Sequence, residues 1–127
     1  MKRLACLLMM TALVLGAAGC GMSSSASAEP KIRYGKDVCS SCKMIISEER
    51  FAAAVVKEPE EVYRFDGIGC MQEFLKTHSD PGDRVWVHDF KTQKWIDAQS
   101  ATIVHRPEKI TPMGDGLVAF SKEENQK

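Results

Sequence analysis

Three sulfur-bearing side chains lie close together in one short segment of the sequence. Cys39, Cys42 and Met44 fall within six residues of one another. Thiolate and thioether sulfurs are soft ligands, and together they favour copper(I) over magnesium or calcium. In an extended segment, residues two apart project to the same side, so Cys42 and Met44 would present both sulfurs to one ion. Cys39 would reach that ion from the preceding loop, and the segment therefore predicts a copper(I) site.

Two other uses of the cysteine pair stay open at this point. One is thiol–disulfide exchange by Cys39 and Cys42, although thioredoxin-like proteins place this motif at the start of a helix and the residues after Cys42 favour a strand. The other is a structural zinc site, which needs four ligands, and Cys70 with one histidine would complete it. A haem c attachment is excluded because Lys43, and not a histidine, follows the second cysteine.

A fourth candidate ligand, Met113, occupies a loop-like segment, Thr-Pro-Met-Gly-Asp-Gly, at residues 111–116. Proline fixes the backbone on one side, and glycine permits close backbone approach on the other. This setting suits the presentation of a side chain to a site. The alternative is that Met113 fills a gap beneath a turn.

Four further residues are held in reserve as ligands: Met71, Asp66, Cys70 and His88. Each has a more ordinary use that the sequence favours. Met71 has the helical spacing of a core residue, and Cys70 is a small residue of the kind that is usually buried. Asp66 precedes a helix and favours the role of its N-cap. His88 is expected at the surface, and Asp89 and Asp97 are expected to cap turns.

The N-terminus has the form of a lipoprotein export signal. Lys2 and Arg3 precede an almost entirely apolar stretch at residues 4–15, which is too short for a comfortable transmembrane helix. Small residues then lead into Cys20, as in the bacterial lipobox, where the cysteine becomes the lipidated first residue of the mature chain. Acyl chains such as palmitate would anchor it to the membrane. The alternative is an ordinary secretory signal that is cleaved after the Ala-x-Ala site at residues 26–28.

These boundaries divide the chain into four parts. We expect a signal peptide at residues 1–19, a lipidated cysteine and flexible tether at 20–33, one copper-binding domain at 34–121 and a charged tail at 122–127. Basic and acidic residues are balanced, 17 of each, so no basic patch points to nucleic acid. The location implied is extracytoplasmic, on the cell membrane or the outer membrane. No Ser-His-Asp set, paired carboxylates or phosphate-binding glycine loop indicates an enzyme.

Hydrophobic periodicity predicts a small α+β domain, a mostly antiparallel sheet with one principal helix. The helix is expected at Ile68–Thr77, where apolar residues fall on one face. Short strands are expected at these ranges: 43–46, 51–56, 62–65, 85–90, 95–98, 101–105 and 117–120. A faint division into two halves accompanies this pattern.

The motifs in their order resemble the NosL family, the lipoprotein copper chaperones that accompany nitrous oxide reductase in denitrification. The resemblance runs from Cys39 to Phe120. Its pieces are Cys39-x-x-Cys42-x-Met44, Tyr63-Arg64-Phe65-Asp66, Gly69-Cys70-Met71-x-x-Phe74, Val87-x-Asp89-Phe90-x-Thr92, Trp95-Ile96-Asp97-Ala98 and Thr111-Pro112-Met113-Gly114.

The resemblance implies a non-enzymatic role: binding of Cu(I) and its delivery to nitrous oxide reductase, with a membrane maturation complex as partner. It also implies a fold of two related ββαβ-type units. By position, it assigns metal binding to Cys39, Cys42, Met44 and Met113. One residue departs from the family pattern, because Lys43 stands where glycine is usual.

Overall fold

The computed structural model describes residues 28–122. The predicted signal peptide, Cys20 and the tail from residue 123 lie outside the described residues. None of the helices in the described part has both the length and the apolar character needed to cross a membrane. Contacts with the domain begin before the expected boundary at Tyr34, because Pro30 is buried and Arg64 Nε donates to the Lys31 carbonyl at 2.7 Å.

Four antiparallel strands form the main sheet, in the order β2-β1-β3-β4. Their bounds are β1 Ala53–Lys57, β2 Glu61–Phe65, β3 Arg84–His88 and β4 Trp95–Asp97. The first four residues of β1 are buried, because small and β-branched side chains fill both faces of an inner strand. A short 3-10 turn, η1 (Glu49–Phe51), leads into β1.

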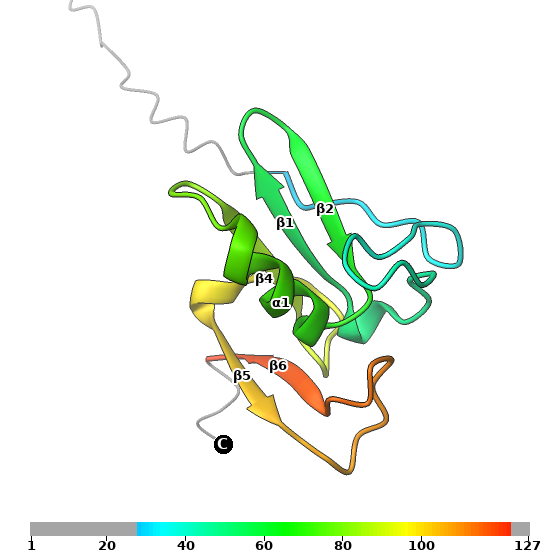
Figure 1. Ribbon diagram of the computed structural model, residues 1–127. Helices are drawn as coiled ribbons and strands as arrows, with labels where there is room; N and C mark the ends of the chain where they lie inside the picture. Colours follow the sequence, from blue (N-terminus) through cyan, green and yellow to red (C-terminus); the bar gives the residue numbers. More distant parts are fainter. Residues whose placement is uncertain (1–27, 123–127) are drawn as a thin grey trace, which may run out of the picture.

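One helix, α1 (Ile68–His78), connects β2 to β3 and packs on the main sheet. Figure 1 shows it in front of that sheet, with the β5–β6 pair below it. Ile68 and Met71 are buried on its inner face, and the Phe74 ring lies 5.2 Å from the ring of Phe65. These are residues of the face that the 3.6-residue period predicted.

Strands β5 (Ala101–His105) and β6 (Leu117–Ser121) form a separate two-stranded sheet. It follows the 3-10 turn η2 (Ala98–Ser100), which Asp97 caps by accepting a hydrogen bond from the Gln99 N–H at 2.7 Å. Asp89 ties this sheet to the main one: its Oδ2 accepts from the Ser121 N–H at 2.8 Å, and its Oδ1 accepts from the backbone after β3. The predicted capping roles of both aspartates are confirmed.

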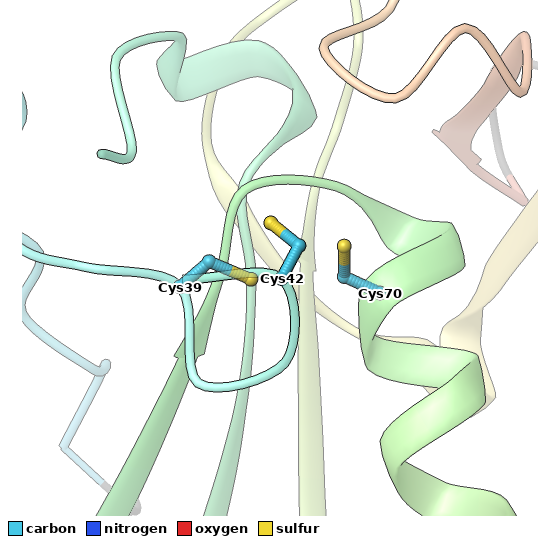
Figure 2. A group of neighbouring side chains, drawn as sticks. All are labelled: Cys39, Cys42 and Cys70. Atoms are coloured by element: carbon cyan, nitrogen blue, oxygen red, sulfur yellow. The ribbon is translucent and has the colours of Figure 1, made fainter. Parts of the chain in front are cut away.

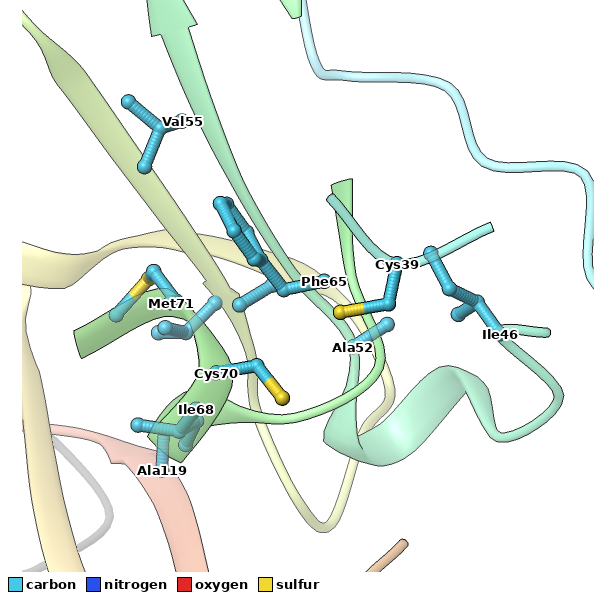
Figure 3. Close-up of a cluster of buried hydrophobic side chains, with 11 residues drawn as sticks. Cys39, Ile46, Ala52, Val55, Phe65, Ile68, Cys70, Met71 and Ala119 are labelled. Carbon is cyan, nitrogen blue, oxygen red and sulfur yellow. The ribbon is translucent and has the colours of Figure 1, made fainter. Parts of the chain in front are cut away.

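The core lies between α1 and the sheets (Figure 3). Its buried residues are Cys39, Ile46, Ala52, Ala53, Val55, Phe65, Ile68, Cys70, Met71, Val87 and Ala119. Two cysteines therefore belong to the core, one from the segment before β1 and the other from α1.

The α+β prediction is confirmed, and the helix and six of the strands lie within two residues of their predicted bounds. The strand predicted at 43–46 is wrong, since that segment makes a single bridge between Val38 and Ile45. The order β1-β2-α1-β3 is one ββαβ unit. The described residues after it contain no second α-helix, so a second complete unit of this type is not found in residues 28–122.

Candidate metal centre

Three cysteine sulfurs meet at the N-terminal end of α1. The Sγ atoms of Cys39, Cys42 and Cys70 all lie within 4.8 Å of one another. Figure 2 shows Cys39 and Cys42 on one loop and Cys70 on the first turn of α1, with their sulfurs gathered between loop and helix. Cys39 and Cys70 are buried, whereas Cys42 is partly exposed. The group is therefore reachable from solvent on the Cys42 side.

A tight turn brings the first two cysteines together. The Cys39 N–H donates to the Met44 carbonyl at 2.8 Å, and the Lys43 N–H donates back to the Cys39 carbonyl at 3.1 Å. Closing this turn requires a left-handed residue, and Lys43 has φ +66°. Glycine adopts this conformation without the penalty that a Cβ brings. The departure from the family pattern at position 43 thus falls on a residue whose backbone conformation favours glycine.

The edge strand β2 holds this turn in place. The Ser40 N–H donates to the Arg64 carbonyl at 2.7 Å, and the Arg64 N–H donates to Ser40 Oγ at 3.1 Å. Because β2 runs directly into α1 through Asp66 and Gly67, the same strand positions both the loop and Cys70. Thiols from segments about thirty residues apart in sequence are brought together in this way.

The environment of Cys39 favours its thiolate. Burial raises the pKa of Cys39, but the backbone N–H groups of Asp66, Cys42 and Ser41 point at its sulfur and lower the pKa below its ordinary value. Burial, together with the nearby Cys39 charge, raises the pKa of Cys70 well above its ordinary value. Cys39 therefore ionises more readily than Cys70. Its negative charge opposes ionisation of Cys70 until a bound cation neutralises it.

Asp66 is close to the group but does not cap α1. The N-cap residue is Gly67, and no side chain bonds to the N–H groups there, so the predicted capping role of Asp66 is wrong. The Asp66 side chain is 3% exposed, and its Oδ1 has no hydrogen-bond partner among the described residues. Burial raises the pKa of this carboxyl, an N–H from Ser47 lowers it, and Glu48 raises it, with a net increase.

The two candidate methionine ligands lie at the surface. Met44 follows the cysteine turn and is 45% exposed, and Met113 is 42% exposed. A Cβ on Gly67 would lie 3.9 Å from Cγ of Met113, so Met113 rests against the residue that precedes α1. This is the end of the helix that carries Cys70. Metal binding by Met44 and Met113 stays a prediction.

The other candidate ligands do not all lie at the cysteine group, because Met71 packs in the core and His88 packs on Trp95. Met71 is 2% exposed and packs in the core, as its spacing predicted. His88, which was expected at the surface, is 1% exposed, so that prediction is wrong. Its Nδ1–H donates to the Ala52 carbonyl at 3.0 Å and its ring packs on Trp95. Burial lowers the pKa of His88, and it is not part of the cysteine group.

Cys70 belongs to the cysteine group, although its place in the sequence favours an ordinary buried role. A lone cysteine in a helix is usually just a small apolar residue, and nothing in its spacing links it to Cys39 or Cys42. The available signal was its place in the first turn after Phe65, Asp66 and Gly67, which sets it beside whatever packs on the end of β2.

Comparison with known proteins adds one finding. No curated protein and no solved structure matches the chain. A family model, NosL, matches residues 32–127, which include all three cysteines and both surface methionines. That family comprises copper-binding accessory proteins, and a cluster of three cysteines is compatible with copper. The chain belongs to the NosL family.

Proposed function

We propose that this protein is a copper(I) chaperone, anchored by lipid outside the plasma membrane, that delivers copper to nitrous oxide reductase during assembly of its metal sites. The observation that carries the proposal is the group of three thiols within 4.8 Å, open to solvent on one side. Family membership supports the copper cargo. The lipoprotein signal in the sequence supports the location.

The sulfur spacing suits a small soft ion. Metal–sulfur bonds of about 2.3 Å in a planar three-coordinate site would set the sulfurs about 4 Å apart. The upper limit of 4.8 Å observed between the cysteine sulfurs requires only a small closure to reach that spacing. Copper(I) accepts two or three sulfur ligands, so the group is sufficient without any further donor.

Partial exposure of the site supports transfer of the cargo. Cys39 and Cys70 are buried, whereas Cys42 is partly exposed and the exposed Met44 follows it two residues later. An acceptor protein can replace the outer sulfur first and the buried ones afterwards. Copper would then pass between ligands without release into water. A thioether needs no deprotonation, so Met44 and Met113 would add neutral sulfur ligands on the outer side of the site.

Neither alternative use of the cysteines has comparable support. A structural zinc site needs four ligands, and within residues 28–122 the group has three cysteines and no histidine or carboxylate. Thioredoxin-like thiol–disulfide exchange places its motif at a helix start, whereas here the motif lies in a turn, its first cysteine, Cys39, is fully buried, and only Cys42 is partly exposed. We therefore propose a role in binding and delivery, with no catalysis.

An anaerobic copper(I) titration of the reduced protein against a competing chelator tests the proposal, with zinc titrated in parallel. We expect one copper(I) per chain and much weaker zinc binding. Cys39→Ser, Cys42→Ser and Cys70→Ser should each lower the copper affinity by more than the roughly 10- to 100-fold that loss of an outer-shell partner causes. Tighter binding of zinc than of copper(I) would refute the proposal.

Methionine variants of the same protein define the rest of the ligand set. Met44→Leu and Met113→Leu keep the side-chain volume and remove the sulfur. The buried Met71→Leu is the matched control, because its sulfur lies in the core. We expect Met44→Leu and Met113→Leu to lower the copper(I) affinity and Met71→Leu to leave it unchanged. An unchanged affinity in Met113→Leu would remove Met113 from the ligand set.

A further inference from the structure

The segment that carries Cys39 and Cys42 exposes several large apolar side chains. We define the thiol ribbon as residues 33–46, whose two limbs are joined by the bridge between Val38 and Ile45. Val38, Met44 and Ile45 are 50%, 45% and 55% exposed, and they are three of the five large exposed hydrophobic side chains in the described part of the chain. Val38 and Ile45 face each other across the bridge, so they form one continuous patch.

The thiol ribbon is held firmly in this exposed arrangement. Across its two limbs, the Gly35 N–H donates to the Ile46 carbonyl at 2.8 Å and the Ile46 N–H donates to the Asp37 carbonyl at 2.9 Å. The turn itself is bonded to β2 through Ser40. A fixed apolar patch of this kind marks an interaction site, because contact with a partner then costs little ordering of the backbone.

The charges on the thiol ribbon have predominantly one sign. Arg33, Lys36 and Lys43 are exposed, whereas the single acid, Asp37, has a side chain that is only 10% exposed. Asp37 is also paired with Arg33 at 2.7 Å and with Arg64 at 3.5 Å. The whole sequence has equal numbers of basic and acidic residues, so this segment is locally basic on a balanced chain.

We infer that the thiol ribbon is the docking surface for the protein that receives the copper, and that this acceptor offers an apolar contact edged by carboxylates. The inference rests on the proposed function and adds the chemistry of the partner. Met44 and Ile45 follow the partly exposed Cys42 by two and three residues, so docking there brings the acceptor's ligands close to that thiol. Complementary charge speeds such encounters and sets their orientation. A lipid surface would attract the same lysines, but it offers no ligand to take the copper.

The test measures the rate of copper transfer from the copper(I)-loaded, full-length lipoprotein in native membranes that contain the maturation complex, with copper-free nitrous oxide reductase added. Lys36→Glu reverses one ribbon charge. The pair Val38→Thr and Ile45→Thr keeps β-branched side chains and removes apolar contact. Lys76→Glu, near the C-terminal end of α1, is the matched charge control. The copper(I) affinity of each variant is measured against the chelator in parallel.

We expect both ribbon variants to transfer copper about tenfold more slowly than the unaltered protein, while their copper affinity changes less than about twofold. Lys36→Glu should also weaken the dependence of the rate on salt. The Lys76→Glu control should transfer at the normal rate. Normal transfer by both ribbon variants would overturn the docking surface while leaving the chaperone role intact.

Two other outcomes identify different failures. If the unaltered protein transfers copper no faster than the copper–chelator complex does, the proposed delivery to nitrous oxide reductase is wrong, and the docking surface falls with it. If Lys36→Glu instead weakens binding to phosphatidylglycerol vesicles and leaves transfer unchanged, the basic charge serves the membrane and the inference is overturned.

Discussion

Replacing Gly69 by alanine tests how the loop at residues 111–116 is seated on α1. A Cβ at position 69 would overlap Oδ2 of Asp115 and lie 3.3 Å from its Cγ. The carboxylate is not free to turn aside. Its Oδ1 accepts from Thr111 Oγ1 at 2.9 Å and from the Leu117 N–H at 3.0 Å. The methyl group therefore has to displace a side chain that is bonded on its other side.

The magnitude follows from these contacts. Breaking the two hydrogen bonds to Asp115 costs about 1 kcal/mol each. Alanine regains up to about 1 kcal/mol over glycine through helix propensity. We therefore expect Gly69→Ala to lower the free energy of unfolding by about 1 kcal/mol. In an Asp115→Ala background nothing obstructs the methyl group, so Gly69→Ala should instead stabilise the fold by up to about 1 kcal/mol.

Urea unfolding of the four proteins in this cycle measures the coupling between the two positions. The two effects of Gly69→Ala differ in sign, and the expected coupling is about 2 kcal/mol. Additive effects, or an alanine that stabilises the protein even with Asp115 present, would refute the reasoning. The same variants report on the site, because a displaced loop carries Met113 away from the end of α1 and should lower copper(I) affinity.

Two further predictions concern single residues that hold the site and the fold. Lys43→Gly removes the steric penalty that a Cβ brings in the left-handed conformation, so it should raise the free energy of unfolding by roughly 0.5–1 kcal/mol in urea titrations. The control, Lys36→Gly, should lower that free energy. A Lys43→Gly protein that is less stable than the unaltered one would contradict this prediction. Asp89→Asn should cost about 2–3 kcal/mol at pH 7, because its carboxylate accepts from three donors of Lys91 and Thr92 in the turn after β3 and from the Ser121 N–H in β6. Burial raises the pKa of Asp89, but the N–H groups of Thr92, Ser121 and Lys91 hold it below its ordinary value, so this stabilisation is complete above about pH 5 and is lost as the pH falls through the folded pKa. Urea unfolding at a series of pH values measures the difference in the free energy of unfolding between the unaltered protein and Asp89→Asn. This difference should be constant from pH 5 to 8 and should shrink below pH 4. A difference that grows on acidification would show that the carboxylate is not its cause.

The parts of the fold governed by local periodicity were predictable. Ile68, Met71 and Phe74 recur at helical spacing, and their burial against the sheet follows directly from that spacing. Short β-branched runs such as β5 were predictable for the same reason. These segments gain their stability by burying one face, and a pattern of residues records which face that is.

The parts governed by contacts between distant segments were not predictable. Residues 43–46 alternate like a strand, yet the left-handed Lys43 closes a turn and β2 holds it. The sequence offers no sign that Asp66 is buried and leaves capping to Gly67, or that His88 lies under Trp95. Cys70 joins the other cysteines only because β2 positions both the turn and the start of α1.

The most direct test of the central claim is X-ray absorption at the copper edge, measured on the reduced protein loaded with one copper(I). The thiol group at the N-terminal end of α1 predicts a coordination shell of two or three sulfurs at about 2.3 Å. It also predicts that Cys70→Ser lowers the sulfur count or brings in an oxygen or nitrogen ligand. A shell dominated by nitrogen or oxygen in the unaltered protein, or one that none of the cysteine substitutions changes, would contradict the account.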